Sequence, residues 1–110
     1  MSQKKKMIRE TFRNEVFKRD KYTCVCCEFK SNSEKCRDEL DAHHVQDRNL
    51  FAFGGYVKGN GITVCKFCHE ICELFHQGKE CPPDFMPDAL YLLINSSFEE
   101  ALKQDEKNCQ

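Results

Sequence analysis

Two pairs of cysteines have the spacing of a metal site. Cys24 and Cys27 form one CxxC turn, and Cys65 and Cys68 form a second. Zn²⁺ prefers four soft or borderline ligands in a tetrahedron, and each CxxC turn can present two thiolates to one ion. We therefore predict one structural zinc ion held by these four cysteines. Apparent binding free energies of roughly 10–16 kcal/mol rival the whole stability of a small domain, so the metal would decide whether the chain folds.

The other cysteines lack partners at metal spacing. Cys26 would form a CxC with Cys24, which is not the usual spacing of zinc ligands. We therefore predict that Cys27 is the ligand and that Cys26 does not bind the metal. An odd total of nine cysteines and a charged amino end, with no secretory signal, argue against a disulfide scaffold. No apolar run approaches membrane-spanning length, so we expect a soluble protein. We interpret the remaining four as core or surface thiols: Cys36, Cys72, Cys81 and Cys109.

Three histidines are arranged around the second cysteine pair. His43 and His44 lie in the long insertion between the two pairs, and His69 directly follows Cys68. Histidine titrates near neutrality, so it can act as a general base or bind a divalent cation. Adjacent residues on a strand point to opposite faces, so His43 and His44 should not both face one ion. A division of labour between the two is therefore predicted.

In order and spacing these residues resemble the HNH endonuclease family, whose ββα-metal motif carries histidines on the first strand, Asn before the second strand and His on the helix. The matching segments are Asp41–Val45, Asn60–Cys65 and Cys65–His69, within a resemblance that covers about residues 19–76. The resemblance implies a metal-dependent enzyme that hydrolyses DNA phosphodiester bonds. It also implies that His44 is the general base, that Asn60 braces the loop orienting His44, and that His43 and His69 bind a catalytic divalent cation.

The third ligand and the identity of that cation are open at this point. Glu73 lies at i+4 from His69, so it could be a ligand or could hold His69 through a second contact. Many family members carry Asp where His43 stands, and imidazole favours Mn²⁺, Ni²⁺ or Zn²⁺ over Mg²⁺. All four ions remain candidates. We interpret His76 as an ordinary core or surface histidine.

The elements that must position these residues are strand, loop, strand and helix. Residues 40–45 and 62–64 have strand character, 28–39 and 46–61 look like loops, and 65–77 reads as a helix that ends at Gly78. The predicted fold class is α+β: a zinc-stabilised ββα-metal (HNH or His-Me finger) domain with flanking helices. We divide it into an N-terminal basic helix (1–21), a nuclease core (22–78) and a C-terminal helical extension (79–110) that packs on the core.

The flanking helices have recognisable signals. Ile8, Phe12, Val16 and Phe17 recur at helical spacing within 8–19, which predicts an amphipathic helix. Beyond the prolines that follow Cys81, a helix over 89–94 and a capping box from Ser97 to Glu100 are predicted, with a frayed end.

The basic charge is concentrated at the amino end. The net charge is −1, yet residues 1–30 carry nine Lys or Arg against four Asp or Glu. This asymmetry permits a phosphate-contacting face, although a solvated surface explains it almost as well. Our candidates for DNA contact are Arg9, Arg13 and Lys18 on the helix, and Arg48 and Lys58 in the loop.

Two other readings compete with the endonuclease. A non-catalytic zinc-binding module that recognises nucleic acid or protein would leave the histidines ordinary, and a redox or metal-storage protein would bind several metal ions per chain. The chain shows no separate specificity module, so we expect cleavage with little sequence preference or a partner protein that targets it. A homodimer would be the simplest route to a double-strand break. By family resemblance we expect the cytoplasm of a bacterial or phage-infected cell.

Overall fold

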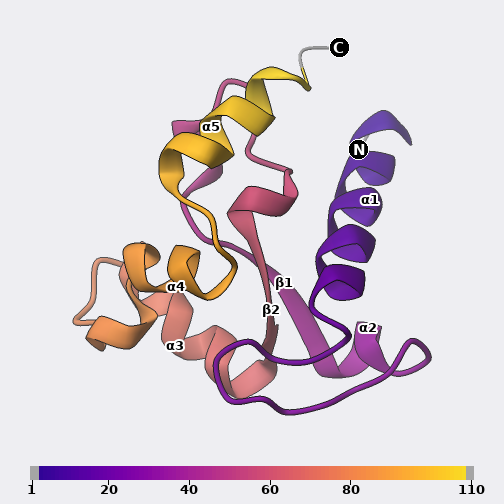
Figure 1. Cartoon of the computed structure of the whole chain (residues 1–110), viewed down its shortest axis with the longest axis vertical. Coiled ribbons are helices and arrows are strands. Elements are labelled where there is room, and N and C mark those ends of the chain that lie inside the picture. Colours follow the sequence, from indigo (N-terminus) through magenta and orange to yellow (C-terminus); the bar gives the residue numbers. More distant parts are fainter. Residues whose placement is uncertain (1–2, 109–110) are drawn as a thin grey trace.

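A two-stranded antiparallel sheet lies at the centre of the structure, a computed structural model in which residues 3–108 are described. Strand β1 (Leu40–His44) pairs with β2 (Gly61–Cys65), and the register places His43 opposite Ile62 and His44 opposite Gly61. Helix α1 (Gln3–Arg19) contacts the sheet on one side, and α3 (Lys66–His76) contacts it on the other (Figure 1). The chain is thus a small α+β domain, and strand β1 carries two adjacent histidines between two helices.

Helix α1 packs on the sheet through its second half. Phe12, Val16 and Phe17 are buried, as their periodicity predicts, and a Cβ added at Gly61 would lie 2.6 Å from both Phe12 and Val16. The prediction that Ile8 belongs to the same buried face is wrong, because its side chain is 40% exposed. The helix begins at Gln3, before the apolar periodicity that starts at Ile8, and its first turns extend beyond the sheet (Figure 1).

The segment between α1 and β1 is not entirely loop. A short helix, α2 (Cys36–Glu39), occupies the end of the range predicted as loop. Asn32 starts this turn, because its side-chain oxygen accepts hydrogen bonds from the backbone N–H groups of Glu34 and Lys35 at 2.9 and 2.8 Å. A single turn has no apolar periodicity, so hydrophobic pattern does not reveal it.

The segment between the strands contains two 3₁₀ turns, η1 (Arg48–Leu50) and η2 (Lys58–Asn60), in a range predicted as loop. Beyond α3, the chain forms η3 (Pro83–Phe85), α4 (Pro87–Leu93) and α5 (Phe98–Glu106). Helix α4 begins before the predicted residue 89, because proline favours the first helical position. The predicted cap of α5 is present: the Ser97 hydroxyl accepts from the Glu100 N–H at 3.0 Å.

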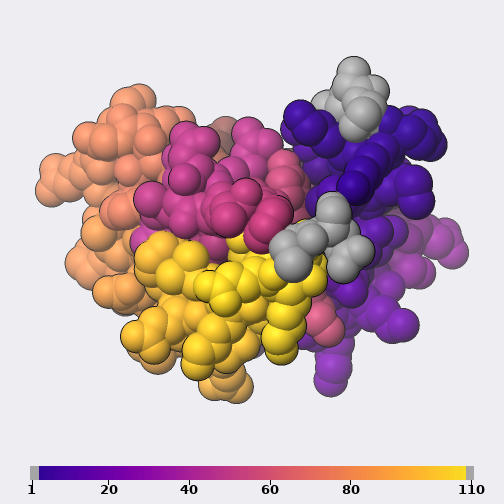
Figure 2. All heavy atoms as spheres, turned by 90° about the horizontal axis from the view of Figure 1, so that it is seen from above, coloured from indigo at the N-terminus to yellow at the C-terminus, as the bar shows by residue number. Residues whose placement is uncertain are grey.

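The C-terminal helices close the core. Leu90, Tyr91 and Ala101 join Ile62 and Val64 of β2 in the main cluster of buried side chains. Seen from above, the indigo surface of α1 and the yellow surface of α5 lie beside the magenta segment that joins the strands (Figure 2). Cys109 and the predicted frayed end lie outside the described residues. Among the described helices, none is long and apolar enough to cross a membrane.

Candidate metal centres and groove

The four cysteines at CxxC spacing come together at one place. The sulfur atoms of Cys24, Cys27, Cys65 and Cys68 all lie within 4.8 Å of one another. The Cys27 and Cys65 sulfurs are 3.7 Å apart. Two sulfur ligands of a tetrahedral zinc ion, at about 2.3 Å from the metal, lie about 3.8 Å apart. The cluster therefore has the donor set and the spacing to hold a metal ion such as zinc.

Each pair reaches the cluster by a tight turn. In the first turn, the Cys24 N–H donates to Phe29 O, and the Val25 N–H donates to Thr63 O of β2, both at 2.9 Å. Cys65 ends β2 and caps α3, because its sulfur accepts from the Cys68 N–H at 3.4 Å. The site thus ties the segment after α1 to the junction of β2 and α3.

The backbone around the first turn favours a thiolate. Burial raises the pKa of Cys24, but backbone hydrogen bonds from Cys65, Cys27 and Cys26 outweigh it, so the pKa is lowered. Cys26 lies outside the four-sulfur cluster and is half-buried against the core that contains Cys72. A hydrogen bond with Cys72 and burial raise the pKa of Cys26 strongly, so it stays a neutral thiol.

A second cluster lies between β1 and α3. Donor atoms of His43, His69 and Glu73 are within 4.8 Å of one another. Glu73 Oε1 lies 3.3 Å from His43 Nδ1 and 3.1 Å from His69 Nε2. Nitrogen and oxygen ligands at about 2.0–2.2 Å from a tetrahedral ion lie about 3.3–3.6 Å apart, so the three residues can hold a divalent cation. Glu73 is thus close enough to both histidines to be a third ligand of such an ion.

The outer contact is made by Asp41, at the start of β1. Its Oδ2 lies 3.0 Å from His69 Nδ1, and its Oδ1 accepts from Lys66 Nζ at 2.9 Å. A carboxylate on the far nitrogen of a histidine fixes the tautomer that leaves the near nitrogen free as a ligand. Asp41 therefore orients His69 so that Nε2 points toward Glu73.

His43 and His44 point to opposite faces of β1, as the strand pleat predicts. His43 is 2% exposed and its ring lies 5.2 Å from that of His69 and 5.3 Å from that of His76. His44 instead stacks on Phe12 of α1 at 4.6 Å, with the Tyr56 ring edge-on at 4.8 Å. His76 thus lies beside the second cluster without belonging to it. The sequence did not indicate this position, because we interpreted His76 as an ordinary histidine.

Both histidines are neutral at pH 7. Burial lowers the pKa of His43 to about 3, helped by positive charge on His69, His76 and His44. Burial, Arg48 and His76 lower the pKa of His44 to about 4, although Asp47 acts in the opposite direction. Among the described residues, Nε2 of His44 has no hydrogen-bond partner. The atom is also buried, so it is an unsatisfied polar group of the protein.

His44 and His69 line the same groove, of about 330 Å³, which we call the His44 groove. Arg9 and Arg48 converge on Tyr56 there, because their guanidinium groups donate to its hydroxyl oxygen at 3.4 and 2.8 Å. Lys58, which we expected beside them, lies in another hollow. The lining of the His44 groove includes four arginines: Arg9, Arg13, Arg37 and Arg48.

Asn60 braces the loop rather than reaching the groove. It is fully buried, its Oδ1 accepts from the Gln46 N–H at 3.0 Å and the Tyr91 hydroxyl at 2.7 Å, and its Nδ2 donates to Gln46 O and Gly55 O. It joins the end of β1 to the loop that carries Tyr56. In the structure Asn60 therefore holds this loop and does not line the groove.

The loop has a second brace, from α5. Asp105 is 1% exposed, and its two carboxyl oxygens accept from the backbone N–H groups of Phe53 and Gly55 at 2.9 and 2.8 Å. Gln104 Oε1 accepts from Gly59 N–H at 2.7 Å. The C-terminal helices thus hold the loop that forms one wall of the groove.

Sequence reasoning missed Asp41, Tyr56, Arg37 and Asp105 as parts of this region. Asp41 had a signal, because it stands two residues before His43 in the matched segment. The other three act through contacts with residues remote in the chain, which spacing does not predict. Comparisons with protein-family models, with curated proteins and with solved structures found no match.

Proposed function

We propose that this protein is a metal-dependent endonuclease that hydrolyses DNA phosphodiester bonds, with a zinc ion in the four-cysteine cluster. One observation carries the proposal. A single groove is lined by a neutral histidine whose Nε2 has no hydrogen-bond partner among the described residues, by a histidine of a three-residue cation site, and by four arginines. A base, a cation and phosphate-binding groups are what hydrolysis of a phosphodiester requires.

His43, His69 and Glu73 are the residues that would hold the catalytic cation. When bound, a divalent cation supplies stabilisation for the negative charge that develops on the phosphate and on the leaving oxygen. Because two of the three donors are imidazoles, Mn²⁺, Ni²⁺ or Zn²⁺ suits the site better than Mg²⁺. Asp41 keeps His69 in the ligating tautomer.

His44 performs the proton transfer. It removes a proton from the attacking water, the water oxygen forms a bond to phosphorus, and the bond to the 3′ oxygen breaks. The products are a 5′ phosphate and a 3′ hydroxyl, which takes its proton from solvent. Arg9 and Arg48 bind phosphate oxygens, since a planar guanidinium can donate two parallel hydrogen bonds to them.

The test is cleavage of supercoiled plasmid and of single-stranded circular DNA by zinc-loaded protein with Mg²⁺, Mn²⁺ or Ni²⁺. His44→Ala is expected to lower the rate about 10²- to 10⁴-fold, the contribution of a general base. Its zinc content and thermal stability should match the wild type. His44→Ala protein that cleaves as fast as wild type would remove His44 from this role.

The alternative is a non-catalytic zinc-binding module that recognises nucleic acid. The four arginines favour it, because such a groove attracts phosphates whether or not a base stands beside it. It predicts DNA binding without cleavage under any of the three cations. Cleavage lost in His44→Ala would exclude it.

A further inference from the structure

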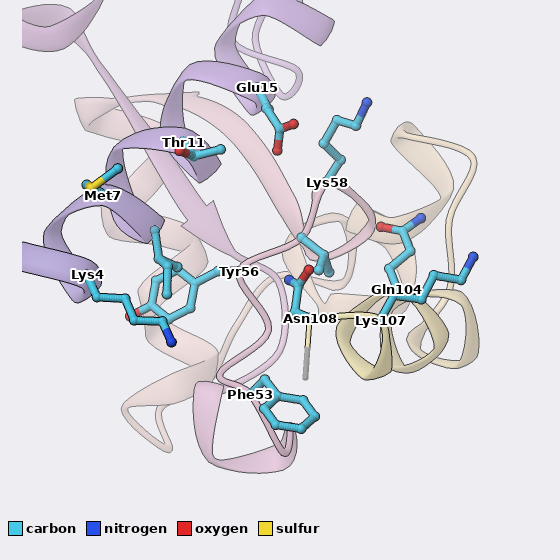
Figure 3. Close-up of a pocket in the computed structure, with 12 residues that line it drawn as sticks. Lys4, Met7, Thr11, Glu15, Phe53, Tyr56, Lys58, Gln104, Lys107 and Asn108 are labelled. Atoms are coloured by element: carbon cyan, nitrogen blue, oxygen red, sulfur yellow. The ribbon is translucent and has the colours of Figure 1, made fainter. Parts of the chain in front are cut away.

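Two hollows continue from the His44 groove along α1. A hollow of about 430 Å³ shares Arg9, Arg48 and Tyr56 with the groove. A cavity of about 940 Å³ shares Ile8, Phe53 and Tyr56 with that hollow. Because each shares lining residues with the next, the three hollows are neighbours along α1, and we call them together the α1 channel. Figure 3 shows its far part, where Lys107 of the C-terminal segment and Lys4 of α1 lie on opposite sides.

The α1 channel is strongly basic compared with the chain. Its lining contains eight Lys or Arg and three acidic residues, Glu15, Asp41 and Asp47, whereas the whole chain has 17 basic and 18 acidic residues. Basic charge concentrated along a concave path attracts a polyanion. The complementary partner is therefore a phosphate backbone that follows the channel.

The part of the α1 channel remote from His44 is also apolar. Met7, Ile8 and Phe53 line it and are 59%, 40% and 45% exposed. Duplex DNA hides the faces of its bases, so a duplex would leave these side chains without apolar partners. An unpaired strand offers base faces that stack on aromatic and apolar groups, while its phosphates contact lysines. Apolar side chains interleaved with basic ones therefore favour a single strand.

We propose that the α1 channel binds an unpaired DNA strand that leads away from the phosphate at His44. The inference rests on the proposed function and names the substrate class of that same site. Phe53 is the stacking platform, held in place because its backbone N–H donates to buried Asp105 at 2.9 Å. Lys58 and Lys107 contact phosphates of the bound strand.

The test is fluorescence anisotropy of zinc-loaded protein, without an added second cation, with two labelled probes. One is a mixed-sequence single strand of about 20 nucleotides, long enough for a site of roughly 4–16 nucleotides, and the other is a hairpin duplex of the same composition. The single strand should bind more tightly. Phe53→Ala should weaken its binding about 5- to 150-fold, the effect of one lost stack, with little change for the duplex.

Matched control variants separate this effect from general surface changes. Leu92→Ala removes an apolar side chain that is 76% exposed on α4, away from the channel lining, and should bind as wild type does. Lys58→Gln and Lys107→Gln should each reduce the salt dependence of binding, whereas Lys103→Gln, also exposed but outside the lining, should not.

The outcomes separate this inference from the proposed function. Duplex binding as tight as single-strand binding, no binding of either probe, or equal affinities for Phe53→Ala and Leu92→Ala would overturn the single-strand channel. If single-strand binding needs Phe53 but no cation supports cleavage, the proposal of a single-strand channel stands and the proposal of an endonuclease is wrong. If the protein cleaves DNA but binds the duplex more tightly, the proposal of an endonuclease stands and that of a single-strand channel is wrong.

Discussion

The two candidate metal clusters share α3 but differ in their donors and in their access to a groove. Cys65 and Cys68 stand at the start of the helix, and His69 follows immediately. The cysteine cluster has four like donors, whereas the histidine cluster has three donors and a member, His69, that lines a groove. Structural zinc sites are closed by four protein ligands, and catalytic sites keep a position open. One helix thus connects a site suited to stability with a site suited to chemistry.

The clusters also differ in what holds their surroundings. The cysteine turns are held by backbone groups of the turns themselves and of β2: the Cys68 N–H donates to the Cys65 sulfur at 3.4 Å, and the Val25 N–H donates to Thr63 O at 2.9 Å. The groove beside the histidine cluster depends on α5, through Asp105 and the loop at Gly55. The cysteine cluster, which α5 does not support, should tolerate changes in α5, whereas the groove should not. The following predictions test this contrast.

The largest effect is expected from Cys68→Ser. Loss of a thiolate removes much of a binding free energy of roughly 10–16 kcal/mol, more than a small domain can spare, so the variant should be unfolded. His69→Ala, on the same helix, should stay folded. Circular dichroism with metal analysis measures both. Cys26→Ser is the matched control, because it alters the same turn outside the cluster, and it should keep the zinc. A folded Cys68→Ser protein would contradict the division between the two sites.

Asp105→Ala should have an intermediate effect. It leaves the buried N–H of Gly55 without an acceptor and removes the partner of Phe53, and we expect about 3 kcal/mol of destabilisation from the two lost bonds. Cleavage should fall while zinc content is unchanged, because the loop wall moves but the cysteine turns do not. Denaturant unfolding measures the first effect. Glu106→Ala, an exposed neighbour on α5, is the control, and equal stabilities would remove Asp105 as a brace.

The contrast also explains what sequence reasoning achieved. The four cysteines, the opposite faces of His43 and His44, and Glu73 on the His69 face all follow from the spacing of residues along a turn, a strand or a helix. Asp105 and Arg37 could not be found in this way, since their roles depend on packing between segments remote in the chain. Ile8 was misplaced because periodicity defines a face of α1 but not where the sheet beneath it ends.

The smallest effect is expected from Asp41→Asn. The substitution keeps the shape but removes the charge that fixes His69 and pairs with Lys66, so affinity for the second cation should fall about 10- to 100-fold. Titration of zinc-loaded protein with Mn²⁺ measures the affinity, and the zinc content reports that the cysteine cluster is unchanged. Asp38→Asn, an exposed acidic residue of α2, is the control. If the two variants bind Mn²⁺ equally, Asp41 does not orient His69. The cation affinity of the histidine cluster would then depend on its three donors alone.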